Sequence, residues 1–336
     1  MNKKILITGG GGYIGSVAVN LFLDKGFEVV VIDNFSRGFQ EPLDLLQKKF
    51  SSQKLRYYKA DLGENLDSVF EKEKNIEAVV HYGAFCSVNE SMEKPEMYFS
   101  NNTAGSLNLL KTMLKFDINK IVFSSTCAVY GEANYMPIDE KHPTLPTNPY
   151  GESKRMVEKM MEWISLRNKL YYVTFRYFNV CGATEDGLIG DSKKPSVHLV
   201  QNAVRGALGI EPFYLTCPDV ATPDKTPIRD YVNVVDLNEA HILGVDYLLN
   251  GGKNEVINIG TGTGNSVLEI IKKIEKITGK KINFQKNNLR AGEYARAVAS
   301  IEKAKQILKW EPKRSIADSI NSLVKWYKLR PHGWNK

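Results

Sequence analysis

The chain has 336 residues, of which 43% are hydrophobic and 25% are charged, and its formal net charge is +7. That length suits a large domain with a smaller one, and the composition is ordinary for a globular protein. Lysines alternate with acidic residues instead of forming a basic stripe with aromatic residues, which argues against a nucleic-acid-binding surface.

The cysteines and the apolar runs exclude further classes of protein. Cys86, Cys127, Cys181 and Cys217 lie far apart, so neither a zinc site nor a disulfide framework is expected. Only three apolar residues follow Lys4 before the first glycines, which is too short for a signal peptide. No apolar run approaches the length of a membrane span. We therefore expect a cytoplasmic protein with no metal site and no membrane partner.

The first element in chain order is a short apolar strand followed by a glycine-rich turn. Residues 5–7 predict the strand, and Gly9, Gly12 and Gly15 stand three residues apart before a helix that continues through residues 17–22. Glycines in such a turn allow a pyrophosphate to approach backbone N–H groups at a helix N-terminus. The pattern predicts a dinucleotide-binding loop, although a glycine-rich turn can also serve structure alone.

The next strand predicts which dinucleotide binds. Residues 29–32 lead to Asp33, eighteen residues beyond Gly15. An acidic side chain at this place accepts hydrogen bonds from the adenosine ribose and repels a 2′-phosphate. NAD is therefore favoured over NADP, while Arg37 nearby leaves that choice open.

Strands and helices continue to alternate through the first half of the chain. Apolar runs at residues 55–58, 78–81, 120–123 and 172–175 each lead into a polar cluster. Such alternation is typical of a doubly wound parallel α/β sheet, whose ligands bind beyond the carboxyl ends of the strands. We expect a Rossmann-type NAD-binding domain over residues 1–180. Beyond it the pattern loosens, so residues 181–336 are expected to form a smaller substrate domain, with some segments returning to the sheet.

Tyr150 and Lys154 are the strongest candidates for catalysis. Four residues apart on a predicted helix, their side chains share one face. A lysine ammonium beside a phenol favours the phenolate, so we expect Lys154 to lower the pKa of Tyr150 and make it a general acid/base. The spacing alone is common on ordinary helices; its position after a dinucleotide loop and the strand end Ser124-Ser125-Thr126 makes it specific.

Taken together, these motifs resemble the extended short-chain dehydrogenase/reductase family, an NAD-dependent epimerase family. More narrowly, four segments are similar to those of UDP-glucose 4-epimerases: residues 91–95, 222–231, 258–267 and 290–292. The resemblance covers nearly the whole chain. It implies reversible C4 epimerisation of a UDP-hexose, in which Tyr150 takes the C4 hydroxyl proton, Thr126 bonds the C4 oxygen and Lys154 holds the nicotinamide ribose. It also implies a homodimer, formed by helices near residues 101–114 and 152–166.

The resemblance further implies two sets of contacts. Expected cofactor contacts are Gly9, Gly12, Tyr13, Ile14, Gly15, Asp33, Asn34, Asp61, Leu62, Tyr82, Asn101, Thr126, Tyr150, Lys154 and Phe178. Expected UDP-sugar contacts are Thr126, Tyr150, Asn179, His198, Leu199, Thr216, Arg229, Arg290, Glu293 and Ala297. Some have plainer readings: Asn101 as a helix cap, Phe178 as core, and Ser266 with Glu269 as a capping box. The chain departs from the family's usual residues at Cys86, His198 and Thr216.

The alternatives differ in chemistry. A dehydratase or decarboxylase of this family needs a carboxylate just after the strand-end threonine, whereas Cys127 and Ala128 follow Thr126. A 4-epimerase of a pentose or uronic acid, a net dehydrogenase, and a non-catalytic NAD-binding protein stay open. In the resemblance, Ala297 borders the sugar's C2 substituent, where a small residue leaves room for an N-acetyl group. We therefore expect UDP-GlcNAc and UDP-GalNAc as additional substrates.

Overall fold

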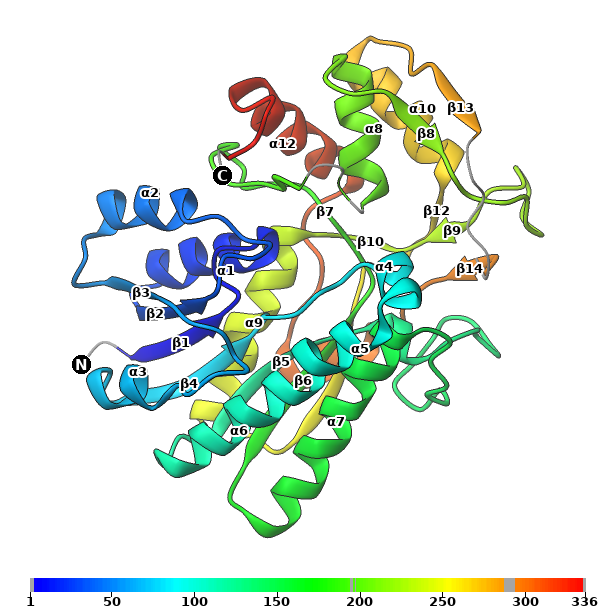
Figure 1. Ribbon diagram of the computed structural model, residues 1–336. Helices are drawn as coiled ribbons and strands as arrows, with labels where there is room; N and C mark the ends of the chain where they lie inside the picture. Colours follow the sequence, from blue (N-terminus) through cyan, green and yellow to red (C-terminus); the bar gives the residue numbers. More distant parts are fainter. Residues whose placement is uncertain (1–2, 194–195, 197, 287–293, 335–336) are drawn as a thin grey trace.

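A seven-stranded parallel sheet forms the centre of the computed structural model, which describes residues 3–193, 196, 198–286 and 294–334 (Figure 1). The strand order is β11-β6-β5-β4-β1-β2-β3, and every neighbouring pair is parallel. The strands are β1 (Lys4–Thr8), β2 (Glu28–Asp33), β3 (Leu55–Lys59), β4 (Ile76–His81), β5 (Lys120–Thr126), β6 (Tyr171–Tyr177) and β11 (Glu255–Ile259). The predicted doubly wound parallel sheet is confirmed.

Strand side chains alternate between two hydrophobic cores, one on each face of the sheet. In β1, Ile5 and Ile7 enter the first core, while Leu6 enters the second. The first core is covered by α1 (Tyr13–Asp24), α2 (Glu41–Phe50), α9 (Val234–Leu249) and α11 (Glu302–Leu308). The second is covered by α3 (Asp67–Lys72), α6 (Gly105–Lys115) and α7 (Pro149–Arg167). Burial on both faces explains why these strands read as continuous apolar runs.

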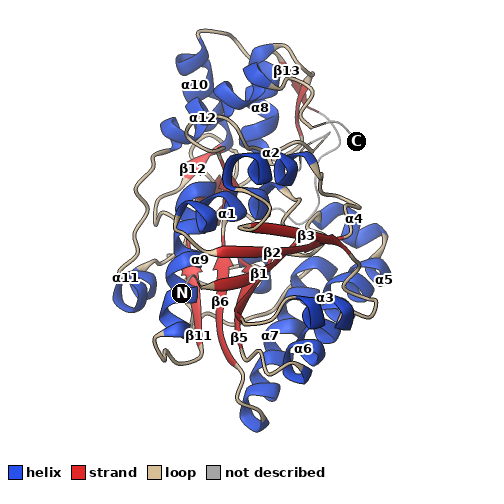
Figure 2. Ribbon diagram, turned by 90° about the vertical axis from the view of Figure 1, so that its left-hand side faces the viewer, coloured by secondary structure: helices blue, strands red, loops and turns tan. Residues whose placement is uncertain are grey.

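A third core holds together the smaller part of the molecule, which lies beyond the carboxyl ends of the strands (Figure 2). Its helices are α8 (Leu199–Leu208), α10 (Val267–Thr278) and α12 (Ile316–Leu329). The capping box of Ser266 and Glu269 is confirmed at the start of α10. The short strands here are β7 (Asn179–Cys181), β8 (Phe213–Leu215), β9 (Ile228–Arg229), β10 (Tyr231–Asn233), β12 (Asn265–Ser266), β13 (Phe284–Lys286) and β14 (Arg296–Ala297).

Between β4 and α6 the chain forms three short helices, α4 (Val88–Glu93), α5 (Pro95–Tyr98) and a π-helix (Phe99–Ala104), and a 3-10 turn (Cys127–Val129) follows β5. Two long-range connections bring later segments back to the sheet. Strand β11 adds to its edge beside β6, and α9 packs on β5 and β6. None of the helices in the described part of the chain is both long and apolar enough to cross a membrane.

Candidate active site

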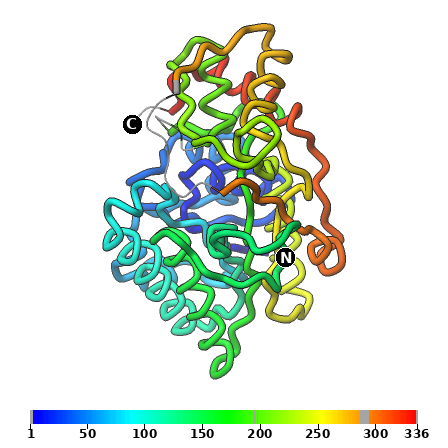
Figure 3. The backbone as a smooth tube through the Cα atoms, turned by 90° about the vertical axis from the view of Figure 1, so that its right-hand side faces the viewer, coloured from blue at the N-terminus to red at the C-terminus, as the bar shows by residue number. Residues whose placement is uncertain are grey.

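A cavity of about 660 Å³ lies between the carboxyl ends of the sheet and the smaller part of the molecule. Both parts line it, from the glycine loop after β1 to Ala297 on β14. The segment before α7 runs beside the segment after residue 294 (Figure 3), and the Ile138 N–H donates to the Val298 carbonyl at 2.9 Å. Residues of both segments line the cavity. Residues from both halves of the chain therefore line a single cavity.

The glycine loop is held in a conformation that other residues would disturb. Gly9 has a φ of +72°, and a Cβ there would lie 2.7 Å from the Gly83 nitrogen. A Cβ on Gly15 would lie 2.1 Å from the Gly9 carbonyl oxygen. Helix α1 starts immediately after Gly12, and no side chain caps its first turn. The N–H groups of its first turn therefore face the cavity, where a bound anion can accept hydrogen bonds from them.

Asp33 ends β2 with both carboxylate oxygens engaged. They accept hydrogen bonds from the Gly11 and Phe35 N–H groups at 2.8 and 2.7 Å. Burial raises the pKa of Asp33 against the lowering effect of these two bonds. Asp61 does not line the cavity; instead it accepts a 2.6 Å hydrogen bond from the Asn34 amide, and Asn34 does line it. Asp61 is thus placed to act through Asn34.

Four more residues that were expected to contact the cofactor line the cavity: Leu62, Tyr82, Asn101 and Phe178. Tyr82 donates to the Asn238 side chain at 2.6 Å and packs on the His241 ring, with centroids 4.7 Å apart. Asn101 lies within the π-helix and is the N-cap of no helix there, so the capping explanation is wrong. Phe178 is 4% exposed and belongs to the first core while also lining the cavity.

Tyr150 and Lys154 enter the cavity from the start of α7. The helix begins at Pro149 because proline suits the first helical position and the Asn148 side chain accepts the Gly151 N–H at 2.8 Å. Lys154 Nζ donates to the Ser124 carbonyl at 2.8 Å and lies 4.8 Å from the centre of the Phe123 ring. Thr126, at the end of β5, accepts the Ala128 N–H at 3.1 Å. The three residues expected to carry the chemistry share one wall.

The electrostatics of this wall correct one expectation. Burial raises the pKa of Tyr150 well above 10, Tyr177 adds to the rise, and a hydrogen bond with Thr126 opposes it. Burial also lowers the pKa of Lys154 to about 8. Lys154 is not among the main groups that shift the pKa of Tyr150, and burial sets the direction of the shift, so the expected lowering of this pKa by Lys154 is not seen in the protein without bound ligands.

The sugar end of the cavity contains four of the expected substrate residues: Asn179, His198, Arg229 and Ala297. Arg229 donates to the Tyr294 carbonyl at 2.8 Å, and Ala297 pairs with Arg229 where β14 meets β9. Burial lowers the pKa of His198 to about 4, so its ring is neutral near pH 7.

Thr126 and Tyr150, also expected to contact the substrate, line the cavity, whereas Leu199 and Thr216 are not among the described residues that line it. Leu199 starts α8 and packs against the third core. Arg290 and Glu293 fall outside the described residues.

Two cationic residues that line the cavity were not predicted from the sequence, Lys193 and Arg296. Lys193 Nζ lies 3.0 Å from Cys86 Sγ, and the Coulomb interaction between these two groups is the main reason that the pKa of Lys193 is raised. The departure from the family's usual residue at Cys86 was a signal that could have pointed to Lys193, because a polar group missing from one segment of a cavity can be supplied by another segment. Of the described residues that line the cavity, Asp33 is the sole carboxylate.

This fold and site define an extended short-chain dehydrogenase/reductase. The family model described as GDP-mannose 4,6 dehydratase matches residues 6–323. The UDP-glucose 4-epimerase of Lacticaseibacillus casei is 42% identical over 334 residues, covering 98% of each chain, and that of Bacillus subtilis (strain 168) is 38% identical over 336 residues, also covering 98% of each. The chain belongs to the UDP-glucose 4-epimerase family.

Solved structures agree with this assignment. The UDP-glucose 4-epimerase from Bifidobacterium longum, in complex with NAD+ and UDP, has a TM-score of 0.93 at 34% identity, covering 99% of this chain and 100% of that one. The UDP-Glc/GlcNAc 4-epimerase from Campylobacter jejuni has a TM-score of 0.83 at 34% identity, covering 98% of this chain and 100% of that one.

Proposed function

We propose that this chain reversibly inverts C4 of a UDP-hexose, interconverting UDP-glucose and UDP-galactose with a retained NAD. The observation that carries the proposal is the grouping of Tyr150, Thr126 and Lys154 on one wall of a cavity that also contains the dinucleotide loop. The relatives named above are UDP-glucose 4-epimerases. Dehydration or decarboxylation is disfavoured because no carboxylate on the described wall stands beside Thr126.

In this reaction the residues of the chain transfer one proton and stabilise the charge that develops on the C4 oxygen. Tyr150, as phenolate, accepts the proton of the C4 hydroxyl, and Thr126 donates a hydrogen bond to the C4 oxygen as charge develops on it. Lys154, anchored on the Ser124 carbonyl, holds the cofactor's ribose. When bound, oxidised NAD supplies a hydride acceptor and a positively charged ring. That positive charge favours the phenolate, which the buried site alone does not.

The charge of the cavity wall supports a ligand pair rich in phosphate. Four cationic residues other than Arg37 line it, against the single described carboxylate of Asp33: Lys154, Lys193, Arg229 and Arg296. Two diphosphates, one in the dinucleotide and one in the UDP-sugar, would match this excess of positive charge. We assign Lys193 to one of these phosphate groups, because it lines the cavity and its side chain contacts the Cys86 thiol there.

We further propose that UDP-GlcNAc and UDP-GalNAc are substrates. Ala297 lines the cavity beside Arg229, and its methyl group leaves space that a large side chain would fill. A site that is open at one substituent tolerates a larger group there without new polar contacts. The structural relative from Campylobacter jejuni is described as a UDP-Glc/GlcNAc 4-epimerase.

We also propose that residues 1–180 bind the cofactor, that residues 181–336 bind the UDP-sugar, and that the protein is a homodimer.

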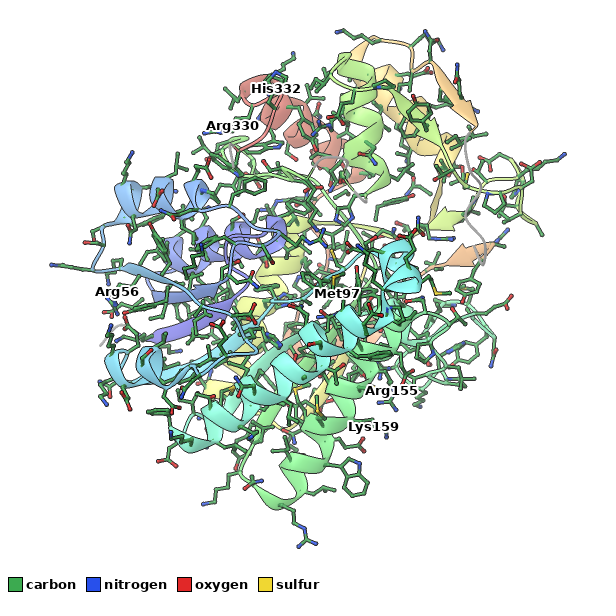
Figure 4. All side chains as sticks on the ribbon, in the orientation of Figure 1. Arg56, Met97, Arg155, Lys159, Arg330 and His332 are labelled. Atoms are coloured by element: carbon green, nitrogen blue, oxygen red, sulfur yellow. The ribbon has the colours of Figure 1, made fainter. Side chains whose placement is uncertain are left out.

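The proposed dimer surface lies on α6 and α7. These helices expose Leu107, Met156, Trp163 and Leu166, and the last two are 69% and 68% exposed. Arg155 and Lys159 project from the same α7 (Figure 4). An apolar surface of this kind is suited to self-association. Light scattering should give twice the chain mass, and Trp163→Lys should halve it while Leu329→Lys on α12 should not. A cytoplasmic location stays a prediction.

The reaction is tested with purified protein and no added cofactor. UDP-galactose and, separately, UDP-GalNAc are incubated and the products followed by NMR. We expect a mixture of C4 epimers from each. Accumulation of NADH with a 4-keto product would indicate a net dehydrogenase, and no conversion despite bound NAD would indicate a non-catalytic protein.

A further inference from the structure

Two side chains near the adenosine end of the cavity favour different cofactors. Asp33 at the end of β2 repels a 2′-phosphate, whereas an arginine in the following loop commonly accommodates one. Arg37 stands in that loop and lines the same cavity. Residue types alone therefore leave the choice between NAD and NADP unsettled, and it depends on what holds Arg37.

Arg37 is held by an element from elsewhere in the chain. Its Nη2 lies 2.6 Å from Oε1 of Glu90 on α4, and its Cζ lies 5.0 Å from the centre of the Phe85 ring. A carboxylate on one side and an aromatic face on the other fix both the charge and the plane of a guanidinium. The Arg37 side chain is 52% exposed, so it is the contacts and not burial that orient it.

Glu90 is itself fixed before any ligand arrives. Its second oxygen, Oε2, accepts a hydrogen bond from the Tyr98 hydroxyl at 3.0 Å, and Tyr98 is fully buried. The same hydroxyl accepts the Ser87 N–H at 2.9 Å, and the Ser87 side chain caps α4 by accepting the Glu90 N–H at 3.3 Å. Burial acts to raise the pKa of Glu90, but hydrogen bonds from Arg37 and Tyr98 outweigh it and leave the pKa below its ordinary value.

We propose that Glu90 is a cofactor-specificity residue, which holds the Arg37 guanidinium against Phe85 and so withholds it from the 2′-phosphate of NADP. Rejection of NADP then has two parts: Asp33 repels the phosphate, and Glu90 occupies the cation that would otherwise attract it. A 2′-phosphate would have to displace a carboxylate already fixed by Tyr98. This proposal rests on the proposed use of NAD.

The test measures binding of NAD and NADP to nucleotide-depleted full-length protein by calorimetry, and needs no turnover. Glu90→Gln keeps the shape and the bond to Tyr98 but removes the charge. We expect it to raise NADP affinity relative to NAD roughly tenfold, the scale of one charge-assisted hydrogen bond. Asp33→Ser with Glu90→Gln should raise it further. Glu93→Gln, an exposed carboxylate on the same α4, is the matched control and should change nothing.

A double variant identifies the cause. If freed Arg37 attracts the phosphate, adding Arg37→Met to Glu90→Gln should cancel the gain. An unchanged ratio in Glu90→Gln, or a gain that survives Arg37→Met, would overturn the proposal; unchanged melting temperatures exclude misfolding as the cause. Wild-type protein that binds neither nucleotide would overturn both this proposal and the proposed function. Protein that binds NAD but does not epimerise would overturn the function alone.

Discussion

The cofactor end and the sugar end of the cavity are built from different kinds of backbone. The cofactor end consists of the start of α7, which carries Tyr150 and Lys154, and of the carboxyl ends of β1, β2, β4 and β5, whose positions are fixed by parallel ladders on both sides. The sugar end is assembled from strands of two or three residues, β7, β9 and β14, with the loops between them. A group carried by a long buried strand can be held to a tight geometry, whereas short strands leave room for substitution. The proposed function thus assigns the chemistry to the rigid end and the choice of substrate to the adaptable end.

The largest effect is expected at the rigid end. Tyr150→Phe removes the proton acceptor and almost no volume from a residue that is 8% exposed. Turnover should fall by on the order of 10² to 10⁴, with NAD still bound. The measurement is kcat on UDP-galactose beside the nucleotide content of the purified variant. Near-normal turnover would remove Tyr150 as the base and with it the idea that the rigid end carries the chemistry.

A second prediction concerns the free energy of unfolding that the protein loses by burying the Lys154 ammonium. Lys154 is 3% exposed, and burial lowers its pKa to about 8 from an ordinary value of 10.5. Because the unfolded chain keeps this proton over pH 8 to 10.5 while the folded one loses it, the group's destabilising contribution is present below pH 8 and fades as pH rises. In nucleotide-free protein, wild type should gain up to about 3 kcal/mol of unfolding free energy relative to Lys154→Met across that range. Parallel pH curves for the two proteins would contradict the lowered pKa.

At the adaptable end, the substitution Ala297→Tyr should change preference without abolishing activity. A phenol ring there would occupy the space that we assign to an N-acetyl group. The ratio of kcat/KM for UDP-GalNAc to that for UDP-galactose should fall at least tenfold, with UDP-galactose itself little affected. A wild type that does not turn over UDP-GalNAc, or an unchanged ratio in the variant, would refute the assignment of Ala297.

The smallest effect is expected for a change at Lys193. Lys193→Met removes a cation that faces the cavity from the smaller part of the molecule. Binding of NAD or of UDP should weaken roughly tenfold, as for the loss of one charge-assisted hydrogen bond, with little change in kcat. Lys193→Arg should restore most of that affinity, and Lys280→Met, at an exposed position on the same part, is the control for net charge. Unaltered affinity for both ligands would show that Lys193 binds neither.

The same contrast explains what could be predicted from the sequence. The dinucleotide loop, Asp33 and the pair Tyr150 and Lys154 follow from local spacing and strand periodicity, which are written in consecutive residues. Arg296 reaches the cavity only because β14 pairs with β9, more than sixty residues earlier in the chain, and no local pattern announces that pairing. The shift in the pKa of Tyr150 depends on burial depth, which spacing does not contain.

The remaining differences have similar causes. Asp61 was expected at the cofactor, which stays a prediction; its side chain bonds Asn34, which lines the cavity, and such a side-chain hydrogen bond cannot be read from local spacing. Leu199 follows a residue that does line the cavity, yet its own side chain turns into the third core at the start of α8. Neighbouring residues on a helix point in different directions, so a shift of one position exchanges a contact for core packing.

The most direct test of the account follows the hydrogen on C4. UDP-galactose carrying deuterium at C4 is incubated with purified protein in ordinary water, without added cofactor, and the UDP-glucose formed is analysed by NMR and mass spectrometry. If hydride is taken up by a retained NAD and returned to the opposite face of the same sugar, the deuterium will remain at C4 of the product. Loss of deuterium to solvent, or its appearance in free NADH, would contradict the account.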